Sequence, residues 1–261
     1  LGMSYSVSNV LAEAGLASIQ RWVPFPLDPA ELRDRIGGKM IRPTTIPETL
    51  EELKIEQAIA REALRLSFIQ HRTFAVKLHG AQQARSIADA FAQGGSDSLV
   101  DLMKLDLLVG SGGVLSHAPR RAQSMLMMID AFQVEGVTEI AVDSIFMMPH
   151  LGVLSTIHPA AATEVFEKDC LVRLGTCVAP VGQVKHGPLL TVELRRAGGA
   201  TTTETLKPGD LRLLPLAVGD EAHAVLTPAR GVDVGAGPGI RLERTLRGGC
   251  VGLVLDGRGR R

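Results

Sequence analysis

Apolar residues recur at helical spacing in the part of the chain from residue 47 to residue 70. A repeat of three or four positions places such side chains along one face of a helix. Thr45 with Glu48 has the spacing of a capping box, and Pro47 suits a first helical turn. The pattern therefore predicts one long amphipathic helix over 47–70. Its apolar positions are Leu50, Leu53, Ile59, Ala63, Leu66 and Ile69.

Weaker patterns predict further elements on both sides of this helix. We expect a short helix over residues 4–15, then a proline-bearing connection over 22–47 with a helical turn at DPAELRDRI. After the long helix, FAVKL is a candidate strand and SIADAFA a further helix.

From residue 105 the pattern alternates between strand and helix. The strand LDLLVG leads through a glycine turn to the helix APRRAQSMLMMIDAF, and the strand TEIAVD leads to helical stretches at MPHLGVLSTIH and HPAAATEVFEK. This β-α-β-α order indicates neighbouring parallel strands with helices across a face, and ligands of such sheets bind at the carboxyl ends of the strands. The glycine turn and Asp143 both fall at such ends.

Beyond residue 168 the pattern changes to short β-type runs between turn sequences such as KPGD and GAGPG. The charge changes at the same place, with 15 basic and 20 acidic residues up to 169 but 13 and 8 after it. We therefore expect an α/β domain over 1–168 and a small all-β barrel or sandwich over 169–261. The strand candidates of the second domain are LLTVELRR, LRLLPLAV, HAVLTPA, RLERTLR and VGLVLD.

Composition narrows the classes of function. The 28 basic and 28 acidic residues balance, and only 3% of residues are aromatic, which argues against nucleic-acid binding. No apolar stretch approaches the length of about 20 residues that spans a bilayer. Three irregularly spaced cysteines make no disulfide framework or zinc knuckle, so we expect a cytoplasmic protein. The opening LGMSYSVSNV resembles an internal segment, and we expect the natural start far upstream.

The sequence LLVGSGGVLSHAP, residues 107–119, carries the candidate chemistry. Glycines let a flat ring or a phosphate touch the backbone, and a helix start presents free N–H groups. We expect Ser116 to cap the helix and Pro119 to lie in its first turn. A nucleotide suits this turn, although a tight strand-to-helix connection without a ligand explains it equally well. The spacing is neither GxGxxG nor GxxxxGK[ST].

This segment resembles the adenosine-contacting motif of the actin, sugar-kinase and 70-kDa heat-shock ATPase superfamily. More closely, the sequence from LVGSGGVLSHAPRR to MMPHLGVLS is similar to the GlmL accessory proteins of methylaspartate (glutamate) mutase, also called MutL and unrelated to the mismatch-repair protein. The segments LGMSYSVSNVLAEAG and RPTTIPETLEELKIEQAIAREALR resemble the same family. The resemblance thus spans nearly the whole chain.

The resemblance implies an actin-like ATPase lobe in residues 1–168, and an accessory, chaperone-like role for adenosylcobalamin-dependent mutase subunits. Members of the superfamily clamp ATP or ADP with Mg²⁺ between two lobes, and their phosphate-binding loops precede a segment like this one. The chain would then contact the nucleoside and, alone, would not hydrolyse ATP. The residues carried over as nucleoside neighbours are Gly110, Ser111, Gly112 and Gly113, with His117 and Asp143 beside them.

For several residues the sequence allows two roles. Asp143 suits a polar contact to a ribose or a partner, but equally a cap for the following helix. Glu56, Arg61 and Arg65 suit either an adenine or a solvated helix face. The scattered histidines predict no metal site, and a methionine-rich patch predicts core more than a partner surface. A small-molecule kinase, an ATP-dependent amidohydrolase of the same superfamily and a non-catalytic scaffold stay open as alternative functions.

Overall fold

The computed structural model describes residues 2–3, 6–75, 100–196, 198–199 and 201–259. These residues form two compact units, each described here by itself. Unit 1 comprises residues 1–101 with 130–132, and unit 2 comprises 102–129 with 133–261. Both the FAVKL strand and the SIADAFA helix that the pattern predicts fall wholly or mainly on residues 76–99, outside the described residues.

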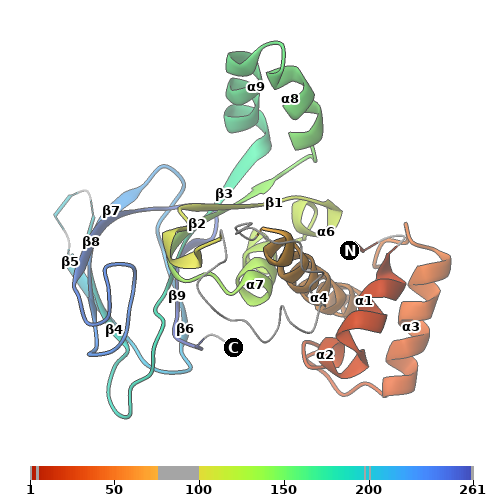
Figure 1. The fold of residues 1–261 in the computed structure, drawn as a ribbon, viewed down its shortest axis with the longest axis horizontal. Coiled ribbons are helices and arrows are strands. Elements are labelled where there is room, and N and C mark those ends of the chain that lie inside the picture. Colours follow the sequence, from red (N-terminus) through yellow and green to blue (C-terminus); the bar gives the residue numbers. More distant parts are fainter. Residues whose placement is uncertain (1, 4–5, 76–99, 197, 200, 260–261) are drawn as a thin grey trace, which may run out of the picture. The chain divides into compact units, whose positions relative to one another are not determined.

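Unit 1 is helical. Its helices are α1 (Val7–Ala14), α2 (Leu16–Gln20), α3 (Pro29–Ile41) and α4 (Leu50–Phe74), coloured red to brown in Figure 1. The first three pack on one another, and α1 and α2 also pack on α4. Their shared core holds the fully buried Val10, Ile19, Leu32 and Ile36 together with Ala58 of α4.

The long helix is confirmed, but its predicted start is wrong. Thr49 caps α4, because its Oγ1 accepts a hydrogen bond from the Glu52 amide while the Glu52 carboxylate accepts from the Thr49 amide. The capping box predicted at Thr45 and Glu48 does not form, and Thr45 Oγ1 donates instead to the Arg42 carbonyl. Both pairs have the same three-residue spacing, so the sequence alone does not separate them.

A second difference concerns the connection predicted over 22–47. The helical turn expected there is the full helix α3, which Asp28 caps by accepting a hydrogen bond from the Ala30 amide. Gly37 and Gly38 lie inside α3 and weaken the local helical pattern. Burial of Leu32 and Ile36 against the other helices stabilises the helix despite these glycines.

Glu62 of α4 is the buried charge of unit 1. Its carboxylate, wholly inaccessible to solvent, accepts hydrogen bonds from Arg21, Trp22 and Arg65 at 2.7–2.9 Å. Burial alone would raise the pKa of Glu62, but the bonds from Arg65, Trp22 and Arg21 outweigh it and hold the pKa below its usual value. The cluster therefore joins α4 to the α2–α3 connection by ionic hydrogen bonds.

Unit 2 contains two sheets. The five-stranded sheet has the order β1-β2-β3-β9-β6, and the four-stranded sheet has the order β5-β4-β7-β8. Apolar residues of both sheets form one core that includes Val178, Leu194, Leu226 and Leu253. The strands are β1 (Leu107–Gly110), β2 (Gly136–Asp143), β3 (Leu171–Ala179), β4 (Leu190–Arg196), β5 (Thr201–Leu206), β6 (Leu211–Leu214), β7 (Glu221–Pro228), β8 (Leu242–Arg247) and β9 (Gly252–Asp256).

The helices of this part of the chain connect or cover the strands. They are η1 (Leu102–Lys104), α6 (Gly113–Ser116), α7 (Arg121–Phe132, whose last three residues belong to unit 1), α8 (Met148–Ser155), α9 (Pro159–Val165) and the π-helical turn η2 (Phe166–Cys170). The predicted β-α-β-α order of residues 105–168 is confirmed, and β1 and β2 are parallel neighbours. The structure as a whole is mixed α/β with two sheets.

Strand pairing runs across residue 168, where the change of pattern predicts a domain boundary. β2 and β3 are antiparallel on either side of it, with Asp143 opposite Leu171. β3 also pairs with β9, and β9 with β6, so strands of the predicted all-β part complete the sheet that β1 begins. The division into 1–168 and 169–261 stays a prediction. Among the described residues, no helix has the length and apolar character to cross a membrane.

Replacing Thr49 by Ala should lower the free energy of unfolding of unit 1 by about 1 kcal/mol, because it removes the side-chain cap of α4. Urea titrations followed by the fluorescence of Trp22, the single tryptophan, measure this loss. Thr45→Ala is the matched control and should cost clearly less. If Thr45→Ala lowered the free energy of unfolding more than Thr49→Ala does, Thr45 would be the cap, as the sequence pattern predicts.

Glu62→Gln should lower the free energy of unfolding at pH 7 by about 2–4 kcal/mol, because the partly exposed Arg21 and Arg65 lose the buried charge that accepts their hydrogen bonds. The folded pKa of Glu62 is depressed, so its contribution is complete above the unfolded value of about 4.3 and is lost as the pH falls through the folded pKa. The difference from wild type should therefore shrink below about pH 4. The exposed Glu51→Gln is the control, and a gap that stays constant with pH would contradict the assignment.

Candidate functional site

The glycine turn and the end of β2 lie side by side in unit 2. β1 ends at Gly110 and β2 at Asp143, and the parallel register places Gly110 opposite Val142. The chain leaves β1 through Ser111 and Gly112 into the short helix α6. The structure therefore brings the predicted site residues of the two strand ends together, at the edge where parallel sheets bind ligands.

The three glycines of the turn differ in their surroundings. A Cβ on Gly110 would lie 2.7 Å from Leu115 Cδ1 and 2.8 Å from Met128 Sδ, so Gly110 makes room for the protein's own core. A Cβ on Gly112 or Gly113 would meet no atom of the described residues within 4 Å. Gly112 also has a φ of 111°, which side-chain-bearing residues rarely adopt. The bare backbone at Gly112 and Gly113 is thus the part of the turn open to a ligand.

Ser111 lies between these glycines. Its Oγ is buried and has no hydrogen-bond partner among the described residues. A buried hydroxyl without a partner is uncommon in folded proteins and calls for an explanation such as a missing ligand or water. Ser111 is therefore a polar group in the turn whose bonding capacity no described residue uses.

The predicted roles of Ser116 and Pro119 are wrong. Ser116 is the last residue of α6, and its Oγ donates a hydrogen bond of 2.5 Å to the Asp143 carbonyl. The helix predicted from residue 118 begins at Arg121, with Arg120 in the capping position, so Pro119 precedes it. The four-residue helix α6 takes up the segment between turn and helix, which the sequence pattern does not resolve from α7.

Asp143 is wholly buried at the end of β2. Its carboxylate accepts hydrogen bonds from the amides of Ile145, at 3.3 Å, and Met148, at 2.9 Å. Burial would raise the pKa of Asp143, but the backbone amides that face the carboxylate outweigh it and lower the pKa. These hydrogen bonds to the residues that follow β2 fit the capping interpretation of Asp143, and a role toward a ligand stays a prediction.

His117 follows α6 on the surface. Its Nδ1 lies 3.3 Å from the Gly113 carbonyl, within the same short helix. The ring is therefore held beside the open glycine backbone, where it can contact a bound ligand. Its role, like that of the glycines, stays a prediction.

The charged residues considered for an adenine on α4 all have partners within unit 1. Glu56 pairs with Lys39 at 2.7 Å, Arg61 pairs with Asp130 at 2.7 Å, and Arg65 pairs with Glu62. Arg61 also lies over the Trp22 ring, 5.5 Å from its centre. These ion pairs hold the helices of unit 1 together, which accounts for the residues without a ligand.

The methionine-rich patch lies partly in the core, as the sequence pattern predicts. Among the described residues, no cluster of histidine, cysteine, aspartate or glutamate side chains could hold a metal ion. His158 caps α9 by accepting a hydrogen bond from the Ala161 amide. Three methionines of α7, Met125, Met127 and Met128, are fully buried in the core.

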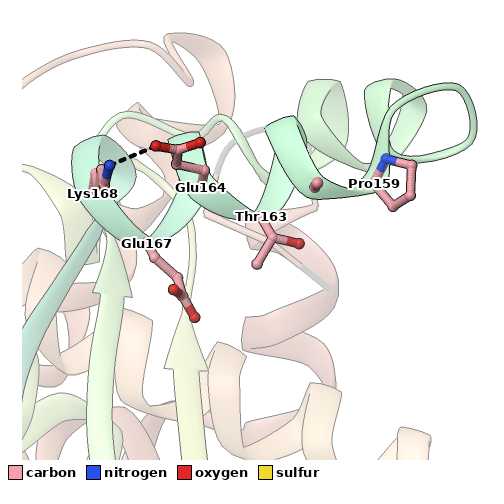
Figure 2. A pocket seen from close by; sticks show the side chains of 6 residues that line it. Pro159, Thr163, Glu164, Glu167 and Lys168 are labelled. Carbon is pink, nitrogen blue, oxygen red and sulfur yellow. Dashed lines mark hydrogen bonds and ion pairs between the residues drawn. The ribbon is translucent and has the colours of Figure 1, made fainter.

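A surface hollow that the sequence does not predict lies along α9 (Figure 2). Pro159, Thr163 and Glu167 line it, and an ion pair of 2.5 Å joins Lys168 to Glu164 at its rim. One helical segment supplies every lining residue, and none is a predicted site residue. The hollow is open, so it does not enclose a ligand.

Comparisons with known proteins give one family. The family model described as "MutL protein" matches residues 1–170. The curated relative "Protein MutL" of Clostridium tetanomorphum is 22% identical over 175 residues, which cover 64% of this chain and 35% of the relative. The chain therefore spans about a third of the length of that relative, and no solved structure matches it. With the family model matching well over half of its residues, the chain belongs to the MutL protein family.

Proposed function

We propose that this chain supplies the nucleoside-binding surface of an accessory protein for an adenosylcobalamin-dependent mutase of the glutamate mutase type. Membership of the MutL family supports the accessory role, because members resemble the glutamate mutase accessory proteins. On this proposal the helices and the five-stranded sheet are part of an actin-like ATPase lobe. ATP or ADP would bind with its nucleoside against residues 111–113.

The open backbone at Gly112 and Gly113 is the observation that carries the proposal. Both positions have room that a side chain would fill, and they follow the carboxyl end of a strand that is parallel to its neighbour. A planar ring system can lie against such a backbone because no Cβ holds it away. Gly110 does not share this role, since Leu115 and Met128 occupy the corresponding space.

The polar groups around the turn suit binding better than catalysis. Ser111 Oγ has no hydrogen-bond partner in the part of the chain that the structure describes, and His117 lies next to Gly113. The one buried carboxylate of the turn, Asp143, accepts hydrogen bonds from the following loop. Contacts to the phosphates and to Mg²⁺ would come from sequence that the relative has and that this chain does not span.

Gly113→Leu tests the nucleoside surface. The φ of Gly113 is not positive and its Cβ direction is empty, so leucine fits the folded protein without strain but occupies the place of the nucleoside. We expect affinity for ATP and ADP to fall by about tenfold or more, which corresponds to about 1.4 kcal/mol. Isothermal titration calorimetry of the complete protein measures the change.

Gly37→Leu is the control for this experiment. Gly37 lies in α3 and has the same empty Cβ direction, so the substitution adds the same side chain to a helical glycine of unit 1. It should leave nucleotide affinity unchanged. Equal affinities for wild type and Gly113→Leu would exclude the turn as the nucleoside surface and favour a scaffold role.

The accessory role predicts ATP-dependent recovery of a mutase. When an inactivated adenosylcobalamin-dependent glutamate mutase is incubated with the complete protein and ATP, its activity should return, and it should not return without ATP. With the Gly113→Leu variant, recovery of mutase activity should be reduced at limiting ATP. It should return to the wild-type level when the ATP concentration is raised, because the substitution weakens ATP binding. A complete protein that binds ATP but restores no mutase activity would refute the accessory role while leaving the nucleoside site intact.

A further inference from the structure

The two helices that connect β2 to β3 expose an unusual amount of apolar surface. α8 and α9 form an antiparallel pair, the α8–α9 hairpin (residues 144–170), drawn in green beyond the ends of β2 and β3 in Figure 1. Leu151 and Ala162 are buried between its helices. The large apolar side chains that it exposes are Ile145, Phe146, Val153, Leu154, Ile157 and Val165.

The degree of exposure is large for several of these residues. Ile157 is 83% exposed, Val153 is 68% exposed, and Ile145 and Phe146 at the base of the hairpin are more than half exposed. Single exposed apolar residues are ordinary, but a group of them on one small element marks an interaction surface. The hairpin therefore presents an apolar surface that the described residues leave uncovered.

The hairpin is attached to the sheet by defined contacts. The Asp143 carboxylate accepts hydrogen bonds from the Ile145 and Met148 amides, and the Ser144 amide donates to the Cys170 carbonyl at 2.8 Å. Phe146 has a φ of 60°, an uncommon conformation for a bulky residue, within the loop that Asp143 holds. A surface held in this way loses little freedom on association, which favours binding.

We propose that the α8–α9 hairpin is a contact through which two copies of this chain associate. The charge pattern decides the occupant. Residues 144–163 contain no Asp, Glu, Lys or Arg, and Glu164 and Lys168 at the end of α9 pair with each other. In a symmetric contact the same patch meets itself, so an uncharged patch is self-complementary and buries no unpaired charge.

Other occupants fit this pattern less well. An anionic membrane surface attracts clusters of Lys and Arg next to the apolar residues, and residues 144–163 have none. A partner with a charged surface would find no counter-charge in the same segment. A second copy of this chain requires neither a cluster of basic residues nor a counter-charge in this segment.

The size of the hairpin sets the expected strength. Stable interfaces use about 20–30 residues on each side, whereas the hairpin exposes the six large apolar side chains named above. The association should therefore depend on protein concentration over roughly the micromolar range. Because the contact is apolar, raising NaCl from about 0.1 M to 1 M should not weaken it.

Sedimentation velocity of wild type and of the double variant Val153→Glu, Ile157→Glu tests the proposal. Wild type should shift from monomer to dimer as its concentration rises. The double variant places charges on two highly exposed positions, so it should fold normally and stay monomeric over the same range. Val218→Glu is the control, because Val218 is 67% exposed in unit 2 but outside the hairpin, and it should dimerise like wild type.

Four outcomes would overturn the proposal. The first is a wild type that stays monomeric at about 100 µM, well above the expected range, and the second is a double variant that dimerises as wild type does. A dimer that dissociates in 1 M NaCl would show that charges hold it together. Wild-type monomer that co-sediments with phosphatidylcholine vesicles, where the double variant does not, would assign the hairpin to a lipid surface. None of these results bears on nucleotide binding, so the test is independent of the proposed function.

Discussion

The buried Asp143 connects the glycine turn and the α8–α9 hairpin, the two regions of unit 2 for which a function is proposed. Its backbone carbonyl accepts the hydrogen bond from Ser116 at the end of α6, which holds the segment after the glycine turn against β2. Its carboxylate accepts hydrogen bonds from Ile145 and Met148 at the base of the α8–α9 hairpin. The depressed pKa keeps this carboxylate ionised at neutral pH, so the bonds are charge-assisted.

The glycines of the turn serve two different purposes in the structure. Gly110 lets Leu115 and Met128 pack against the end of β1, and a side chain there would displace core atoms. Gly112 supplies a backbone angle that turns the chain into α6, and Gly113 leaves space at the surface. Packing at Gly110 therefore fixes one side of the turn, and a fixed backbone would favour the nucleoside binding proposed for the open glycines beside it.

The sequence predicts those parts of the fold that depend on local patterns. The alternation from residue 105 to 168 predicts β1, α7 and β2 because each element repeats its apolar positions with its own period. Local patterns fail where two similar signals compete, as with Thr45 and Thr49, and where a strand is polar. β5 reads TTTETL and lies at the edge of its sheet, so it lacks the apolar alternation that identifies strands.

For the candidate site, the pattern predicts which residues meet but not what each one contacts. The parallel strand ends bring Gly110 and Asp143 together, as the β-α-β order predicts. Gly110 is enclosed because the side chains of Leu115 and Met128 pack against it. This tertiary contact is not visible in the spacing of apolar residues along the sequence. Strand pairing is equally non-local, since β9 and β6 join β3 from the far end of the chain.

The α8–α9 hairpin connects β2 to β3, and the fold of the sheet does not by itself explain the apolar surface of the hairpin. The two strands are antiparallel neighbours, and a turn of two residues can join such strands. The chain instead inserts the α8–α9 hairpin, whose helices pack mainly on each other and bury few of their own apolar side chains. The sheet does not need the hairpin for its hydrogen bonds, and the hairpin gives little to the core. This position in the fold is consistent with the contact between two copies that is proposed for its apolar residues.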